Sequence, residues 1–273
     1  MKTVPKTRNK DAKQPLIKLK PRELEILILL YRFRYLTSQH IQTLLNHKHR
    51  EAIRRWLNNL TDKKYITRFY SRKFGGDAAY YCLDRTTRKY VKEHSEIKEM
   101  DFGKLARVYK EKTLSRTFQN HCLFLADVYI SLLELIKKNN AKLHFYTKTD
   151  LHGMEYLIYD HPDAYFAIEE ADTSIKRYFL DIFDPMPPRK ELYKRIYQYF
   201  NYYERKFWQN HNKNPFPLII LLAPNDWAKG YLQRKIGEKL KEKRTDLEFY
   251  LSTWEEIQKQ GINRQVLHKV ETK

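Results

Sequence analysis

The first hundred residues alternate apolar and polar positions with the spacing of short helices. After Pro21, which suits the first turn of a helix, apolar side chains recur every three or four positions and predict a first helix. Thr37 is a suitable N-cap for a short second helix, and a third helix is predicted to begin near His49. Its apolar positions are Ile53, Trp56, Leu57 and Leu60. We expect these four side chains to face inward.

Two segments rich in β-branched and aromatic residues, 65–71 and 79–83, follow the third helix. Residues 75–77, Gly-Gly-Asp, are a turn signal between them, so the pair is predicted to be a hairpin. Three short helices followed by a hairpin is the order of a winged helix-turn-helix, with the third helix as the recognition helix. The sequence therefore predicts a winged-helix DNA-binding domain over residues 21–94.

The second half of the chain changes to longer helices and buried strands. A long amphipathic helix is predicted over residues 114–138, an aromatic-rich helix over 189–211 and a further helix over 227–241. The predicted strands are 142–147, 155–159, 164–169, 177–183, 218–222 and 247–251. This order predicts an α/β domain with a mixed sheet over residues 113–255, and a mixed α+β fold class for the whole chain.

Three remaining segments complete the predicted organisation. Residues 1–20 hold six Lys and one Arg with little apolar pattern, and we expect them to form a disordered basic arm. Residues 95–112 are polar and are predicted to link the two domains. Residues 256–273 are expected to form a C-terminal tail.

The formal net charge is +20, and most of the surplus lies at the N-terminal end. Residues 1–100 contain 24 Lys and Arg against 10 Asp and Glu, whereas residues 151–200 contain 6 against 9. Because neutralised phosphates release condensed counterions, a concentrated positive charge favours a nucleic acid partner. A charge that only aids solubility is the alternative. The hydrophobic content of 42% excludes a wholly disordered chain.

No membrane span, signal peptide or disulfide framework is expected. The apolar runs 24–31 and 216–223 are shorter than the roughly 20 residues that a spanning helix needs. The basic N-terminus lacks an apolar signal core. Cys82 and Cys122 are too few for a disulfide framework and lack a metal-binding spacing. We therefore expect a cytoplasmic protein.

Basic and amide side chains on the third helix and the hairpin are the candidate DNA contacts. An exposed Arg can bind guanine edges or phosphates, and an Asn can bind adenine. The candidates are Lys48, Arg50, Arg54, Arg55, Asn58, Arg68, Arg72 and Lys73. Two alternatives stay open, because any solvated helix can carry several arginines and winged helices also serve as protein-binding modules.

A second candidate site rests on two carboxylates. Asp163 follows a proline at the start of one predicted strand and Asp181 lies in the next, the layout of the metal-holding carboxylates in restriction-endonuclease-like cores. Such oxygen ligands would hold Mg²⁺ between water and a scissile phosphate. A nuclease of that kind places Lys two residues after the second carboxylate, where this chain has Phe183. The candidate substitutes on the next helix are Lys194 and Arg195. Spectator carboxylates are the alternative, and DNA binding itself is expected to require no cofactor.

Two further patterns on predicted helices allow a structural or a functional interpretation. His121 and Asp127 lie six residues apart, on different faces of one helix, which favours a packed or hydrogen-bonded His121 over a catalytic dyad. Residues 193–208 contain eight aromatic side chains. This belt could stack the bases of single-stranded DNA, although packing in the core is the commoner explanation.

The order of several short segments resembles the replication-relaxation family, proteins of bacterial plasmids and integrative elements. In the N-terminal half these segments read YLTSQHIQTLL, AIRRWLNNLTDKKYITR and AYYCLDRTTRKYV. In the second half they read NHCLFLADVYISL, HPDAYFAI, YFLDIFD, YKRIYQYFNYY and PLIILLAPNDWAKGYLQRKI. The resemblance covers roughly residues 20–255 and implies DNA handling for a mobile element. The family's acidic strand commonly reads Glu-x-Asp, so one acidic group is here displaced to Asp184 or lost.

These observations together predict a DNA-binding protein that acts in replication, relaxation or transfer of a bacterial plasmid or mobile element. Its expected partners are double-stranded DNA and proteins of the replication or relaxase machinery, and a homodimer is left open. The alternatives are a Mg²⁺-dependent nuclease that uses Asp163 and Asp181, and a transcriptional regulator.

Overall fold

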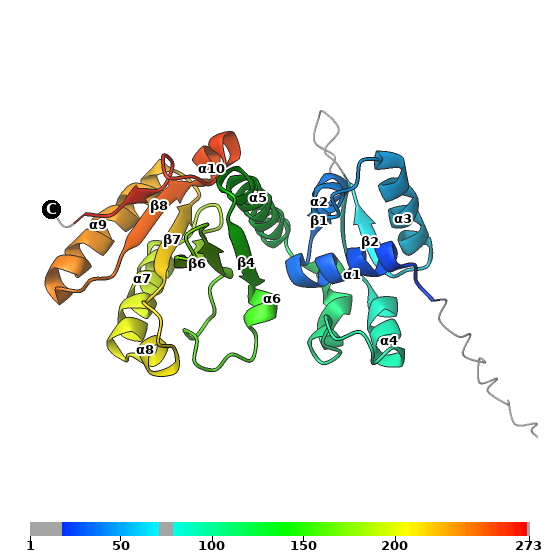
Figure 1. Cartoon of the computed structure of the whole chain (residues 1–273), viewed down its shortest axis with the longest axis horizontal. Coiled ribbons are helices and arrows are strands. Elements are labelled where there is room, and N and C mark those ends of the chain that lie inside the picture. Colours follow the sequence, from blue (N-terminus) through cyan, green and yellow to red (C-terminus); the bar gives the residue numbers. More distant parts are fainter. Residues whose placement is uncertain (1–17, 71–78, 272–273) are drawn as a thin grey trace, which may run out of the picture.

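A computed structural model describes residues 18–70 and 79–271, with a helical N-terminal half and a second half built around a sheet (Figure 1). The elements of the N-terminal half are α1 (Pro21–Phe33), β1 (Leu36–Thr37), α2 (Ser38–Leu44), α3 (Arg50–Asp62), β2 (Ile66–Phe69), β3 (Tyr80–Leu83) and α4 (Arg85–Glu93). β1 and β2 pair antiparallel on either side of β3. This is the order of elements that the sequence predicts for a winged helix.

Local sequence signals explain where these helices begin and which face they bury. Pro21 is in the first turn of α1, and the Thr37 hydroxyl caps α2 by accepting a hydrogen bond from the His40 amide at 3.0 Å. On α3, Ile53, Leu57 and Leu60 are buried, as the helical spacing predicts. The cap and the inward face of α3 are therefore confirmed.

Several predictions fall on residues outside the described ranges. They are the basic arm as far as residue 17, the turn at 75–77, and the candidate DNA contacts Arg72 and Lys73. Leu19, the one apolar residue at the described end of the predicted arm, is buried in the core of the N-terminal half. The arm therefore cannot extend to residue 20, because Leu19 already belongs to the packed domain.

The segment predicted to link the two halves is packed, which corrects that interpretation. It contains η1, a 3₁₀ helix at Lys104–Thr113. Met100, Leu105 and Val108 are buried and belong to the same apolar cluster as α1. A few buried side chains in a mainly polar stretch give no clear periodicity, so the sequence pattern did not reveal this packing.

The second half is a six-stranded mixed sheet flanked by helices. Its elements are α5 (Arg116–Asn139), β4 (Lys142–Thr147), α6 (Lys148–Leu151), β5 (Ala164–Glu169), β6 (Ile175–Ile182), α7 (Arg189–Glu204), α8 (Phe207–His211), β7 (Leu218–Ala223), α9 (Asp226–Lys243), β8 (Phe249–Thr253), α10 (Trp254–Gln260) and β9 (His268–Lys269). The strand order is β4-β5-β6-β7-β8-β9, with β4 to β6 antiparallel, β7 and β8 parallel to β6, and β9 antiparallel to β8. The predicted mixed fold class is confirmed.

Successive residues of β6 point to opposite faces of the sheet. Leu180 and Ile182 pack in one apolar cluster with α5, whereas Phe179 and Phe183 pack in another with α7 and α9. The first cluster also contains side chains of α1 and α3, and Figure 1 shows α5 between the sheet and the N-terminal half. The two halves therefore share one continuous core.

Two segments before the end of the sheet differ from the predicted pattern. Residues 155–159 form turns and bends rather than a strand, although Leu157 and Ile158 are buried. The aromatic-rich helix is interrupted between α7 and α8, where Lys206 adopts a left-handed backbone conformation with φ of 55°. The apolar residues at 155–159 are buried in a loop. A short apolar run of this kind does not distinguish a strand from a packed loop.

The expected C-terminal tail is also packed. It contains β9 and the last five residues of α10, and Ile257, Ile262, Val266 and Val270 are buried. β9 pairs with β8. Because β9 has only two residues, its sequence contains no strand pattern that could have predicted this contact. Over the described residues, no helix is both long and apolar enough to cross a membrane.

Candidate functional site

The outward face of α3 carries a group of exposed cations. Arg50, Arg54 and Arg55 are exposed, as is Lys48 just before the helix. Among the residues that the structure describes, none of these four side chains forms an ion pair or a hydrogen bond. Their charges are therefore available to an anionic partner.

Arg68 and Asn58, two further predicted DNA contacts, bind each other. The Arg68 guanidinium donates to the Asn58 amide oxygen and, at 3.1 Å, to the Tyr70 hydroxyl. It also lies over the Tyr81 ring, 5.4 Å from the centroid. Arg68 is thus held where β2 meets α3, and the Asn58 oxygen is already occupied.

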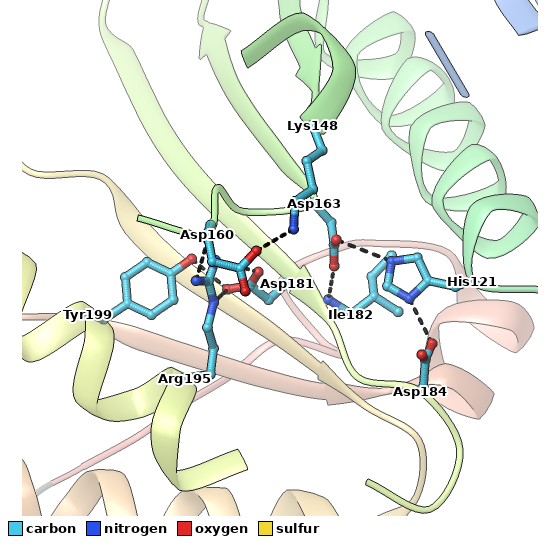
Figure 2. A network of polar contacts seen from close by, with 9 residues as sticks. All are labelled: His121, Lys148, Asp160, Asp163, Asp181, Ile182, Asp184, Arg195 and Tyr199. Carbon is cyan, nitrogen blue, oxygen red and sulfur yellow. Dashed lines mark hydrogen bonds and ion pairs between the residues drawn. The ribbon is translucent and has the colours of Figure 1, made fainter. Parts of the chain in front are cut away.

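The two predicted carboxylates lie at the same end of neighbouring strands. β5 and β6 pair antiparallel with Ala164 opposite Leu180, so the next opposed positions are Asp163 and Asp181. Figure 2 shows, however, that the two carboxylates bind different partners. The structure therefore gives two polar groups at this edge rather than a shared pair.

The first group joins His121 of α5 to two carboxylates. His121 Nε2 lies 3.2 Å from Asp163 Oδ1, and Nδ1 lies 2.8 Å from Asp184 Oδ1 (Figure 2). The second oxygen of Asp163 accepts a hydrogen bond from the Ile182 amide at 2.9 Å. These contacts tie α5 to the ends of β5 and β6.

The protonation of this group follows from its burial and its charges. Burial by itself would lower the pKa of His121, but the carboxylates of Asp163 and Asp184 outweigh burial and raise the pKa to about 10. Burial would raise the pKa of Asp163, but His121 and the Ile182 amide lower it below its ordinary value. His121 is therefore an imidazolium at neutral pH and a poor general base.

The second group is centred on Asp181. Arg195 of α7 donates to both of its oxygens, from Nε at 2.7 Å and from Nη2 at 2.8 Å, and the Tyr199 hydroxyl donates at 2.6 Å. Arg195 also donates to the Asp160 carbonyl at 2.6 Å. Lys148 completes the surroundings through an ion pair with the Asp160 carboxylate at 2.7 Å. β6, α7, α6 and the loop that contains Asp160 thus meet at the end of the sheet (Figure 2).

Burial acts in opposite directions on the pKa values of Arg195 and Tyr199, the two residues that bind Asp181. It would lower the pKa of Arg195, but the Asp181 carboxylate holds that pKa above its ordinary value. Burial also raises the pKa of Tyr199 well above its usual range, so the hydroxyl stays protonated and can donate. The Asp181 carboxylate is therefore neutralised by the Arg195 cation and hydrogen-bonded by Tyr199.

These contacts do not fit the proposed Mg²⁺ site. Both oxygens of Asp181 already accept hydrogen bonds from Arg195, and Asp163 is engaged by His121. Lys194 is exposed, and of the two candidates it is Arg195 that binds Asp181. Within residues 18–70 and 79–271, no three His, Cys, Asp or Glu side chains are grouped so as to hold a metal ion.

A cavity of about 650 Å³, lined by residues of both halves, lies beside His121 and Asp163. The N-terminal half contributes Arg32 and Arg34 to its lining. Both side chains are already paired, Arg32 with Asp150 and Arg34 with Glu111. The cavity therefore borders the carboxylate edge, and these two arginines already have carboxylate partners.

Sequence reasoning missed several partners in this arrangement. His121 is hydrogen-bonded, as expected, but to Asp163 and Asp184 rather than to a residue of its own helix. Asp127 instead pairs with His40 of α2 at 2.8 Å. The available signal was the set of short segments noted in the second half, since His121, Asp163, Asp181 and Arg195 each lie in one of them. Asp184, at the end of the acidic segment, is a partner of His121.

Comparison with family models matches residues 27–219 to the replication-relaxation family, more than half of the 273 residues. Comparison with curated proteins gives no match. Among solved structures, a mutant of ZitR from Lactococcus lactis is similar at 20% identity over 46% of this chain and 77% of its own, with a TM-score of 0.25. A TM-score this low supports no argument about fold or function.

Proposed function

Because the chain belongs to the replication-relaxation family, we propose that it binds duplex DNA through the outward face of α3 during replication, relaxation or transfer of a plasmid or mobile element. The observation that carries this proposal is the group of exposed cations at Lys48, Arg50, Arg54 and Arg55, which have no acidic partner among the described residues. Four cations left unneutralised on one face raise the local positive potential. Binding of a polyanion is the favourable way to neutralise them.

The arrangement of the N-terminal half supports the same role. α3 is the second helix of the pair α2–α3 and has the hairpin β2–β3 beside it, so it can enter a major groove while the hairpin follows the backbone. Arg68 lies on the hairpin side of α3. The amide nitrogen of Asn58 can donate to adenine. For Asn58 to bind adenine at two positions, its amide oxygen must first lose its hydrogen bond with Arg68.

The remaining parts of the proposal rest on the sequence. The basic residues before residue 18, together with Arg72 and Lys73, would add phosphate contacts. Proteins of the replication or relaxase machinery are the proposed further partners, and a homodimer would place two copies of α3 on two half-sites. Neither DNA binding by α3 nor these interactions requires a cofactor.

The test is duplex binding by a variant with Arg50→Ala, Arg54→Ala and Arg55→Ala together. Fluorescence anisotropy with a labelled duplex, over a range of salt concentrations, should give an affinity lower by at least about tenfold. The slope of log affinity against log salt should fall by roughly one for each phosphate that the variant no longer neutralises. A footprint on DNA of the element would then locate the bound sequence.

A matched control removes three exposed lysines from the second half, Lys137, Lys138 and Lys259. This variant loses the same net charge, so its affinity should fall much less if α3 makes the contacts. Equal effects of the two triple variants, with both folds intact by circular dichroism, would contradict the assignment to α3.

Two other functions have less support from the geometry. A Mg²⁺-dependent nuclease would need Asp181 to exchange its bonds with Arg195 for a metal ion. A transcriptional regulator would use the same α3 surface, and footprints on origin DNA and on promoter DNA distinguish it from the proposed role. The likeness of the second half to restriction-endonuclease cores stays a prediction.

A further inference from the structure

Four aromatic side chains lie in two short rows on neighbouring helices of the second half. On α7, the Tyr193 and Tyr197 rings are 6.5 Å apart and inclined by 19°; on α9, the Trp227 and Tyr231 rings are 6.1 Å apart and inclined by 18°. We call these four residues the aromatic ladder. Tyr193, Tyr197 and Trp227 are 43%, 46% and 51% exposed. These three side chains are therefore partly accessible to solvent.

The two rows belong to one surface, because α7 and α9 run side by side in the same direction. At their N-terminal ends the Arg189 guanidinium lies over the Trp227 ring, 5.4 Å from its centroid. At their C-terminal ends Glu204 and Lys243 form an ion pair at 2.8 Å. Figure 1 shows both helices at the end of the molecule opposite α3.

Three ladder residues, Tyr193, Tyr197 and Trp227, lie outside the apolar cluster that packs on the sheet, whereas Tyr231 is half-buried against it. The inward face of α7 buries Leu192, Ile196 and Phe200, and that of α9 buries Leu232 and Ile236. Outward positions of a surface helix are normally polar. The three exposed aromatic residues of these two adjacent helices therefore call for a role outside the core.

The charge around the ladder is strongly positive. Residues 189–244 contain 14 Lys and Arg against 5 Asp and Glu. Arg189, Lys190 and Lys194 are exposed and form no ion pair with another described residue. Arg234 lies over the Tyr231 ring at 5.7 Å from the centroid. Cations thus flank the rings at both ends of the α9 row.

We propose that the aromatic ladder binds single-stranded nucleic acid. Unpaired bases stack on exposed aromatic rings whatever their sequence, while neighbouring Lys and Arg side chains contact the phosphates. A duplex keeps its bases stacked on each other and cannot use the rings in this way. The core of a protein-binding surface is depleted of charged residues, so the positive charge of this surface favours a polynucleotide over a protein partner. The site is separate from α3 and does not depend on duplex binding there.

The experiment compares three labelled probes on the full chain by fluorescence anisotropy. The probes are oligothymidylate and oligouridylate of about 20 nucleotides and a duplex of the same length. A variant with Tyr197→Ala and Trp227→Ala should bind the single strands at least about tenfold more weakly and keep its duplex affinity. The ratio of affinities for the two single strands identifies which of them is preferred.

Matched variants keep the test decisive. Tyr197→Phe with Trp227→Phe retains the rings and should restore strand binding, whereas Tyr159→Ala removes a ring that is 89% exposed outside the ladder and should change nothing. The triple arginine variant of α3 should lose duplex binding and keep strand binding. Strand affinity that is equal in the wild type and the Tyr197/Trp227 alanine variant would overturn the proposal. Self-association through this face without strand binding, measured by sedimentation, would also overturn it.

Discussion

Arg195 and Asp181 form a two-point ion pair, with donor–acceptor distances of 2.7 and 2.8 Å, where only about a tenth of either side chain is exposed. A buried pair of this kind combines Coulomb attraction with fixed hydrogen-bond geometry. It joins α7 to β6 at the edge where the sequence predicts a metal site. Its consequences for stability and for catalysis can be tested separately.

Breaking this pair on one side should destabilise the fold strongly. Arg195→Met leaves the Asp181 carboxylate buried with Tyr199 as its remaining side-chain donor, and Asp181→Asn leaves the Arg195 cation uncompensated. Each change should lower the free energy of unfolding by about 3–5 kcal/mol, measured by urea denaturation. The double variant should cost about 2 kcal/mol less than the sum of the two single changes, because the two residues interact.

The control for this comparison of single and double variants is the exposed ion pair Arg234–Glu238 on α9. Replacing either member by Ala should change the free energy of unfolding little, since exposed pairs are screened by solvent. Additive costs for Asp181→Asn and Arg195→Met would show that the buried contact contributes no coupling energy.

His121 should give the stability of the protein a specific pH dependence. Its pKa in the folded state, about 10, exceeds the ordinary value of 6.5. Its stabilising contribution is therefore complete below pH 6.5 and is lost as the pH rises toward and through 10. The difference in free energy of unfolding between the wild type and His121→Gln should be constant just below pH 6.5 and shrink steadily above it.

Nitrogen NMR of the imidazole provides the direct measurement. The His121 ring signals should keep their protonated shifts through neutral pH and change only near pH 10. The signals of the other histidines serve as references in the same sample. A His121 titration centred near 6.5 would mean that Asp163 and Asp184 do not hold its proton.

The two halves should unfold as one cooperative unit. The apolar cluster runs from α1 through α5 to the sheet, and Arg32 of α1 donates to the Phe145 carbonyl of β4 at 2.6 Å. Amide hydrogen exchange should therefore give the same free energy for global opening at Ile26 in α1 and at Ile220 in β7. Clearly different values would show that the N-terminal half opens on its own.

Metal-dependent cleavage should be absent or slow. Arg195 occupies both oxygens of Asp181, and position 183 is Phe where a water-activating Lys would stand. Supercoiled DNA incubated with the protein and Mg²⁺ should stay intact, with a chelator as control, and Asp163→Asn should still bind DNA. Rapid nicking that Asp163→Asn abolishes would make the second half an enzyme.

The sequence by itself determined the features that depend on local spacing. Helical periodicity located α1, α3 and α5, and the strands predicted at 142–147 and 164–169 have the observed ends of β4 and β5. The outward position of Arg54 and Arg55 followed from the same periodicity, because residues that flank buried positions on a helix must face solvent. The net charge of the N-terminal half is a property of composition alone.

Only the tertiary structure decided which polar residues meet. His121 lies 42 residues before Asp163 and 63 before Asp184, and no periodicity relates positions that far apart. Lys194 and Arg195 are neighbours in sequence, yet about 100° of helical rotation puts one in solvent and the other against Asp181. The packing of α7 on the sheet fixes that rotation, so the partners of the carboxylates became known only when the sheet and its helices were placed together.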